Sequence, residues 1–308
     1  MPLVPEVDVL LATYNGEKYI EEFLISLSEQ KNCKINLFVS DDGSEDSTIP
    51  IVLKYQDSFN NFYLMEGPKL GPMQNFFFLM KNSKAAFVAL ADQDDIWMEN
   101  HLEISTTRLQ GEDSPCLTFS SVAQFTVNPI NFQIWPTSQN QPKFPSILFE
   151  NIGRGCTFVM NSTARDLVNA FQPQNAIMHD WWILLRVLLH GKVIFSPTPE
   201  IFYRIHDTNF IGLGNRGVKS VLKTLGSGKI QTLQQVRELS RASTGEIKSK
   251  EQFDLSGFLS RLDCGLFQRI RLAGSINLKF REKAFDDFRF RIIIIFLPIL
   301  NRRAKLLK

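Results

Sequence analysis

The chain has 308 residues, of which 44% are hydrophobic and 21% charged, and this apolar content, with 26 Phe, excludes a disordered protein. A net charge of +2 hides an asymmetry, because residues 1–215 carry −10 and residues 216–308 carry +12. No apolar run reaches the ~18 residues that a membrane-spanning helix needs, and four widely spaced Cys exclude a Cys-x-x-Cys metal site. The Cys spacing and the lack of a signal pattern lead us to expect a cytoplasmic protein with reduced thiols.

The first part of the chain alternates strand and helix patterns. Short apolar runs predict four strands, at 7–12, 35–39, 62–65 and 87–91. Apolar residues at helical spacing predict helices at 17–29 and 73–81, and Asp46 or Ser47 can cap a further helix after the second strand. Strands that alternate with helices predict a mainly parallel sheet, with ligands at the carboxyl ends of its strands.

Residues 113–215 are less regular. Strand patterns occur at 116–124, 155–160, 192–196 and 201–203, and helical patterns at 166–171 and 179–189. Residues 127–145 carry four Pro and predict a long loop. After residue 215, basic helical patterns lead to an apolar run at 292–300. We therefore predict an α/β domain over 1–215 and a basic helical region over 216–308.

Acidic clusters follow two of the predicted strands. The string Asp92-Gln93-Asp94-Asp95 places three carboxylates in four residues, which repel one another unless a cation or hydrogen-bond donors compensate. Oxygen ligands on a loop suit Mg²⁺ or Mn²⁺, and an exposed turn before a helix is the alternative. In Asp41-Asp42-Gly43-Ser44 a buried carboxylate could accept a hydrogen bond from the N3–H of a pyrimidine, or the segment could form a turn and helix cap.

Several motifs in order give the chain a resemblance to a known family. They are Thr-Tyr-Asn-Gly at 13–16, Asp-Asp-Gly-Ser at 41–44, Asp-Gln-Asp-Asp-Ile-Trp at 92–97, Gly-Cys at 155–156, His-Asp-Trp-Trp at 179–182 and Tyr-Arg-Ile-His-Asp-Thr-Asn at 203–209. Together they resemble family-2 glycosyltransferases of the GT-A fold, and are most similar to bacterial rhamnosyltransferases of surface-polysaccharide pathways. This resemblance implies a Rossmann-like mixed, mainly parallel sheet flanked by helices, with a nucleotide-sugar half over about 1–112, an acceptor half over about 113–215 and a basic helical extension.

The resemblance also implies which side chains hold the donor. Its nucleotide-sugar contacts would come from Thr13, Tyr14, Asn15, Asp41, Asp42, Lys69 and Asp92. Asp94 and His206 would bind the Mg²⁺ or Mn²⁺ ion that bridges the diphosphate and acts as Lewis acid at the leaving group.

Asp180 is the implied general base. It would take the proton of the acceptor hydroxyl as that oxygen attacks the anomeric carbon, with inversion of configuration. Trp181 and Trp182 would desolvate it or stack on an acceptor sugar, and Gly155 and Cys156 would border the acceptor. In the alternative interpretation, Asp180 caps a helix, and the Trp pair and Cys156 belong to the core.

The function implied is an inverting, metal-dependent transfer of a sugar, with dTDP-rhamnose the favoured donor, to a saccharide acceptor carried on a polyprenyl diphosphate. Basic residues around the run 292–300 would attach the protein to an anionic membrane surface, and a buried core segment is the alternative. No nucleic-acid-binding motif accompanies the charge. A UDP-hexose donor and a non-catalytic scaffold that binds nucleotide sugar or membrane remain as alternatives.

Overall fold

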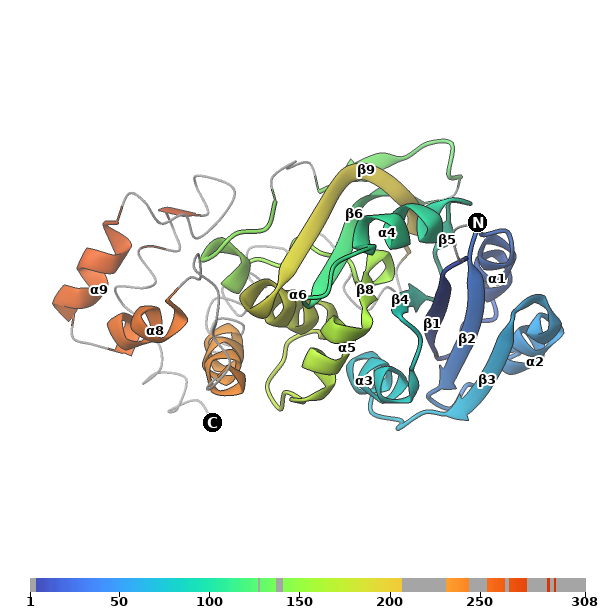
Figure 1. Cartoon of the computed structure of the whole chain (residues 1–308), viewed down its shortest axis with the longest axis horizontal. Helices are drawn as coiled ribbons and strands as arrows, with labels where there is room; N and C mark the ends of the chain where they lie inside the picture. Colours follow the sequence, from blue (N-terminus) through green and yellow to red (C-terminus); the bar gives the residue numbers. More distant parts are fainter. Residues whose placement is uncertain are drawn as a thin grey trace. The chain divides into compact units, whose positions relative to one another are not determined.

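Figure 1 shows the computed structural model of the chain, which describes residues 4–126, 128–136, 141–206, 231–243, 254–263, 266–275, 287–288 and 291. The chain divides into two compact units. The first comprises Met1–Gln141, Gly153–Gln172 and Met178–Gly212, and the second Pro142–Ile152, Pro173–Ile177 and Leu213–Lys308. The second unit thus takes two short segments from within the range 1–215.

The first four strands of the first unit are parallel and follow the predicted alternation. β1 (Glu6–Thr13) lies between β2 (Lys34–Asp41) and β4 (Phe87–Asp92), and β3 (Asn61–Glu66) pairs with the other edge of β2. The connections contain α1 (Ile20–Ser28), α2 (Thr48–Lys54), the short 3₁₀ helix η1 (Gln56–Ser58) and α3 (Pro72–Asn82). All four predicted strands are confirmed, as are the three helices, each within a few residues.

The strand register brings the acidic clusters together. Thr13 pairs with Asp41 between β1 and β2, and Ala12 pairs with Asp92 between β1 and β4. Because these three strands are parallel, their carboxyl ends meet at one edge of the sheet. Residues 7–11 of β1 are all buried, as expected of a parallel strand covered on both faces.

The rest of the sheet mixes parallel and antiparallel pairs. Beyond β4 come β8 (Val159–Asn161), β6 (Cys116–Phe125), β9 (Lys192–Arg204) and β5 (Ile96–Trp97), and β7 (Gln133–Trp135) pairs with β6. In the described part of the chain, nine strands form this one sheet. The mixed sheet flanked by helices agrees with the predicted fold class.

Three details differ from the sequence prediction. Strands β5 and β7 were not predicted, and the strand expected over 155–160 is a 3₁₀ turn, η3 (Gly155–Thr157), followed by β8. The two strands expected near the end of the unit are one strand, β9, because its pairing with β6 resumes after a register shift. Pro197 and Pro199 lie in that shift, where the ladder needs no N–H group from them.

A buried ion-pair network ties α4 (His101–Leu109) to β9. The Glu200 carboxylate lies 2.6 Å from Nη1 of Arg108 and 3.2 Å from Nδ1 of His101, and its side chain is only 4% exposed. Burial alone would raise the pKa of Glu200, but the hydrogen bonds and charges of His101 and Arg108 outweigh it and lower that pKa. The network therefore depends on an ionised Glu200.

The remaining helices of the first unit are α5 (Ser162–Asn169) and α6 (His179–His190). The Asn161 side chain caps α5 by accepting a hydrogen bond from the Ala164 amide. The chain enters α6 from the loop 173–177, and α6 is the element that carries the predicted base.

The C-terminal part of the second unit is mainly helical where it is described. A helix at 231–242 is followed by α8 (Leu255–Asp263) and α9 (Leu266–Ala273), and segment 142–152 contains the 3₁₀ helix η2 (Ser146–Leu148). Within this unit, Glu238 accepts hydrogen bonds from the amides of Gln174 and Asn175, at 2.6 and 2.8 Å, and the Gln235 side chain accepts one from the Ile177 amide at 2.8 Å. Among the described residues no helix is both long and apolar enough to span a membrane, and the run 292–300 lies outside them.

Candidate active site

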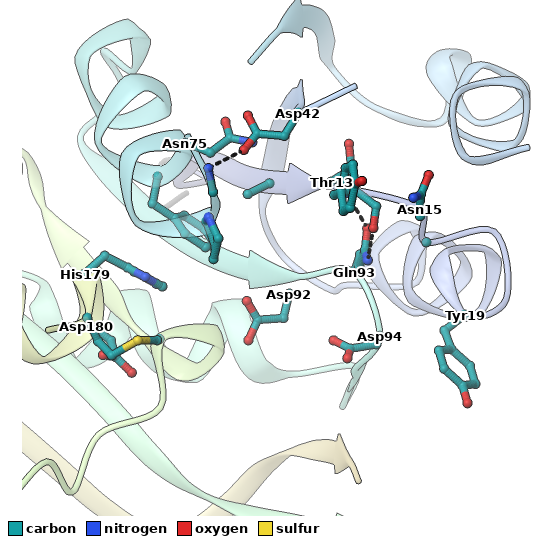
Figure 2. Close-up of a pocket in the computed structure, with 18 of the residues that line it drawn as sticks. Thr13, Asn15, Tyr19, Asp42, Asn75, Asp92, Gln93, Asp94, His179 and Asp180 are labelled. Carbon is teal, nitrogen blue, oxygen red and sulfur yellow. Dashed lines mark hydrogen bonds between the residues drawn. The ribbon is translucent and has the colours of Figure 1, made fainter. Parts of the chain in front are cut away.

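A cavity of about 740 Å³ lies at the carboxyl ends of β1, β2 and β4 (Figure 2). Its walls come from the loops after these strands, from the first turns of α3 and α6, and from the end of β9. The predicted site residues that line it are Thr13, Tyr14, Asn15, Asp42, Lys69, Asp92, Asp94, Gly155, Asp180 and His206. The fold thus brings together side chains that are up to about 190 residues apart in the sequence.

Hydrogen bonds fix the loop that follows β1. The Tyr14 amide donates to Oε1 of Gln93 at 3.1 Å, and Nε2 of Gln93 donates back to the Tyr14 carbonyl at 3.0 Å. A Cβ at Gly16 would come within 2.3 Å of the same Gln93 oxygen, so only glycine allows this close approach. The Asn15 amide donates to the Ser44 hydroxyl at 2.9 Å, which joins the loops after β1 and β2. This wall of the cavity is therefore braced on two sides.

Asp41 does not line the cavity. Its Oδ1 accepts hydrogen bonds from the hydroxyls of Thr13 and Ser44, at 2.8 and 2.5 Å, and its Oδ2 accepts from the amides of Gly43 and Ser44, at 3.0 and 2.7 Å. A carboxylate offers about four acceptor positions. All four acceptor positions of Asp41 are occupied here. This agrees with the alternative interpretation of residues 41–44 as a turn.

Asp42, in contrast, faces the cavity and holds the loop that follows β3. Its two oxygens accept hydrogen bonds from the amides of Lys69 and Gly71, at 3.0 and 2.9 Å. The Lys69 ammonium lies 2.7 Å from Glu66, and both side chains are more than half exposed. Because an exposed pair contributes at most about 1 kcal/mol, Lys69 can exchange Glu66 for an anionic ligand at little cost.

Asp92, at the end of β4, and Asp94, two residues later, line the cavity, and Asp94 meets His206, which lies two residues beyond β9. Oδ2 of Asp94 lies 2.6 Å from Nε2 of His206, and the Tyr19 ring packs against the imidazole with centroids 5.0 Å apart. Burial and the negative charges of Asp94 and Asp180 raise the pKa of Asp92 to about 7, which indicates negative charge that the neighbouring cations do not balance.

The Asp94–His206 pair fits a divalent cation. A carboxylate oxygen and an imidazole nitrogen are suitable donors, and both residues line the cavity. Adjacent ligands at octahedral bond lengths of about 2.1 Å stand about 3 Å apart, so the two atoms need to separate by only a few tenths of an ångström.

A second group of potential ligands, Asp92, Asp95 and Cys156, offers atoms within 4.8 Å of one another. It suits a cation less well, because burial and the charges of Asp95 and Asp92 raise the pKa of the Cys156 thiol well above its usual value, and the thiolate is the form that binds metal. Asp95 is fully buried and accepts a hydrogen bond from the Arg204 amide at 3.0 Å. Asp95 therefore joins the loop after β4 to β9, and Cys156 is a buried side chain outside the cavity lining.

The first turn of α6 brings Asp180 to the cavity but not the two tryptophans. Trp181 and Trp182 are 7% and 0% exposed and lie outside the lining. Their side chains point about 100° and 200° further around the helix than that of Asp180, which is the buried side, whereas His179, on the other side of Asp180, lines the cavity. The two tryptophans thus belong to the core, as in the alternative interpretation of the sequence.

Arg154 and His179 are among the lining residues that the sequence analysis did not single out as site residues. The Arg154 guanidinium lies between the rings of Trp135 and Tyr203, 4.3 and 4.9 Å from their centroids, and its charge opposes the rise in the pKa of Asp92. No sequence spacing connects these three residues, which the fold alone brings together. His179 stood inside a motif, but only the fold shows its imidazole at the cavity.

Comparison with known proteins shows the family. The model of the family "Glycosyl transferase family 2" matches residues 8–163. The dTDP-rhamnosyl transferase RfbG of Shigella flexneri is 30% identical over 230 residues, which are 70% of this chain and 78% of the relative. The UDP-Glc:alpha-D-GlcNAc-diphosphoundecaprenol beta-1,3-glucosyltransferase WfgD of Escherichia coli is 26% identical over 187 residues, 61% of this chain and 71% of that protein.

The fold is also shared with a solved structure. The mannosyltransferase PcManGT from Pyrobaculum calidifontis, determined with GDP-Man and Mn²⁺, superposes with a TM-score of 0.52 at 14% identity, over 96% of this chain and 87% of that one. This likeness confirms the predicted GT-A-type fold. Together with the match over 8–163 and the similarity to RfbG, it shows that the chain belongs to glycosyl transferase family 2.

Proposed function

We propose that this family-2 enzyme transfers a sugar, with inversion and with the help of a divalent cation, from a nucleoside diphosphate to a hydroxyl of a saccharide. The observation that carries the proposal is that Asp180, Asp94 and His206 line one cavity, in which Figure 2 shows Asp92 between Asp180 and Asp94. A base and a cation site are thus separated by the space in which a sugar would be transferred.

The nucleotide of the donor would lie against the braced loop after β1. Thr13, Tyr14, Asn15 and Asp42 line this end of the cavity, and Asp41 orients the Thr13 hydroxyl. The name of RfbG supports dTDP-rhamnose as the donor. The name of WfgD supports the alternative, a UDP-hexose.

Asp94 and His206 would hold Mn²⁺ or Mg²⁺, and the Mn²⁺ in PcManGT supports this assignment. Bound there, the cation would neutralise charge on the departing diphosphate. Lys69, which is free to leave Glu66, would add a second positive charge to the same group.

Asp180 would act as the general base. Its carboxylate takes the proton of the acceptor hydroxyl while that oxygen forms a bond to the anomeric carbon, and the bond to the diphosphate breaks on the opposite face. The configuration at that carbon therefore inverts.

The acceptor would be a saccharide on a polyprenyl diphosphate, used in the synthesis of a cell-surface polysaccharide. The name of WfgD, which includes diphosphoundecaprenol, supports such an acceptor. The charge of +12 in residues 216–308 would bring the enzyme to the anionic inner face of the cell membrane, from the cytoplasm. A scaffold without turnover is the competing function.

The first test measures melting temperature with dTDP, UDP or GDP, each with Mn²⁺ or with EDTA. We expect dTDP or UDP to raise the melting temperature only when Mn²⁺ is present, because a ligand of the native state stabilises it by linkage. Asp94→Asn should lose this shift, whereas Asp113→Asn, at an exposed carboxylate outside the cavity, should keep it. A shift that persists in EDTA and in Asp94→Asn would contradict the proposed cation site.

A second test, a turnover assay, distinguishes an enzyme from a non-catalytic scaffold. Release of dTDP from dTDP-rhamnose with a lipid-linked saccharide should fall by about 10²–10⁴-fold in Asp180→Asn, since a general base contributes that much to the rate. The nucleotide shift of this variant should equal that of the wild type. Unchanged turnover in Asp180→Asn would remove Asp180 from the mechanism.

A further inference from the structure

His179 is a polar group in the cavity that the mechanism above does not use. Its side chain lines the cavity, and the residue as a whole is only 5% exposed. Neither Nδ1 nor Nε2 has a hydrogen-bond partner among the residues that the structure describes. Buried polar groups are nearly always paired, so a ring with two unpaired nitrogens at the wall of a binding cavity points to a ligand.

The orientation of this ring is fixed without polar contacts. One face stacks on Phe76 of α3, with centroids 4.1 Å apart and planes 22° from parallel. Its edge lies against Gly155, where an added Cβ would come within 2.8 Å of Nε2 and 3.3 Å of the Asp180 Cβ. Glycine at this position therefore makes room for the imidazole beside the proposed base.

The charge state of the ring indicates what it binds. Burial lowers the pKa of His179, although the charge of Asp180 opposes this effect, so the imidazole is neutral at pH 7. A neutral imidazole has one N–H donor and one acceptor nitrogen. A hydroxyl group can satisfy either of them, whereas a fully ionised phosphate accepts hydrogen bonds only and is better matched by a cation.

We propose that His179 binds a sugar hydroxyl beside Asp180 and thereby helps to determine which sugar the enzyme accepts. Figure 2 shows His179 next to Asp180, on the side of the cavity away from Asn15 and Tyr19. This position suits the transferred sugar or the acceptor sugar rather than the nucleotide base. The inference rests on the proposed function, and the hydroxyl belongs to one of these two sugars.

The test compares His179→Phe, which keeps a ring on Phe76 but has no nitrogen, with His179→Gln, which keeps a hydrogen-bonding amide. For His179→Phe we expect kcat/KM to fall about 10- to 100-fold, the range expected for one or two hydrogen bonds, with partial recovery in His179→Gln. The melting-temperature shift by dTDP and Mn²⁺, which involves no sugar, should stay at the wild-type value in both variants.

The two sources of the hydroxyl give different results. If the transferred sugar supplies it, the additional shift that dTDP-rhamnose produces over dTDP disappears in His179→Phe. If the acceptor supplies the hydroxyl, the additional melting-temperature shift remains in His179→Phe and the KM for the acceptor rises.

Equal kcat/KM in the wild type and His179→Phe would overturn the inference and leave the proposed function intact. A wild type that neither binds a nucleotide sugar nor turns it over would overturn both. If His179→Phe does not fold, the same comparison is made between the wild type and His179→Leu, which also has no hydrogen-bonding group, and an unchanged kcat/KM together with an unchanged additional melting-temperature shift by dTDP-rhamnose would overturn the inference.

Discussion

Aspartates that follow strands in similar motifs have different chemistry because their neighbours differ. Asp41 accepts four hydrogen bonds inside a turn, which leaves it no acceptor position for a ligand. Asp92 is crowded by other carboxylates, and Asp94 faces an imidazole. At the scale of the residue, the number and sign of the surrounding groups decide whether a carboxylate maintains the fold or serves the site.

Asp41→Asn tests this distinction. The amide that replaces one oxygen cannot accept a hydrogen bond, so two of the four donors lose their acceptor, and we expect the free energy of unfolding to fall by about 2 kcal/mol. Urea denaturation measures this loss, with Asp113→Asn as an exposed control that should stay within about 0.5 kcal/mol of the wild type. Equal midpoints for Asp41→Asn and the wild type would contradict the turn role.

Much of this site chemistry could be predicted from the sequence, but not all of it. Asp92, Asp94 and Asp180 stand in local motifs, and the strand pattern placed the first two at the carboxyl end of the sheet. The side chain directions within α6 depend on how the helix is rotated about its axis, which packing decides. Arg154 carries no local signal, since its partners Trp135 and Tyr203 are 68 residues apart in the sequence.

At the scale of elements, β9 likewise could not be predicted from local sequence patterns alone. Its pairing with β6 spans 76 residues, and the pattern around Pro197 and Pro199 looks like a break between two strands. The first four strands were predictable because each is a short, mainly apolar run between polar segments. The two-residue strand β5 exists only because β9 supplies its partner, so no local pattern could reveal it.

The Glu200 network that ties β9 to α4 predicts a pH dependence of stability. The pKa of Glu200 is lowered in the folded protein, so its contribution is present above the unfolded-state pKa and is lost as the pH falls through the folded-state value. In Glu200→Gln the unfolding free energy should fall by about 2 kcal/mol at pH 7, and the difference from the wild type should shrink below about pH 4.5. Urea denaturation from pH 3 to 8 measures both curves, and a constant difference would refute the role of the ionised carboxylate.

At the scale of the whole molecule, the chain crosses between the two units several times. Segments 142–152 and 173–177 belong to the second unit, yet each is followed by a segment of the first. Residue 178, which follows the loop held by Gln235 and Glu238, comes just before His179 and Asp180. Only two residues, Met178 and His179, therefore separate the loop held by the helix at 231–242 from the proposed base Asp180 in the sequence.

Glu238→Ala tests how strongly that helix holds the loop. The amides of Gln174 and Asn175 lose their acceptor, so their hydrogen exchange should accelerate, and the free energy of unfolding should fall by about 2 kcal/mol. Hydrogen exchange with mass spectrometry over 172–180 measures the first effect. Gln234→Ala, at an exposed position on the same helix, is the control and should leave exchange unchanged; equal exchange in both variants would contradict the assignment.

The span of the last sheet pairings also determines when the cavity can form during protein synthesis. His206 meets Asp94 across 112 residues of chain, and at about 5–20 residues per second the two leave the ribosome roughly 6–20 s apart. Strands β1 to β4 can pair during that interval, because they are consecutive around the sheet and need nothing from β9. The nascent chain can thus form the wall proposed for the nucleotide first, and the two proposed cation ligands meet only after residues beyond β9 have emerged.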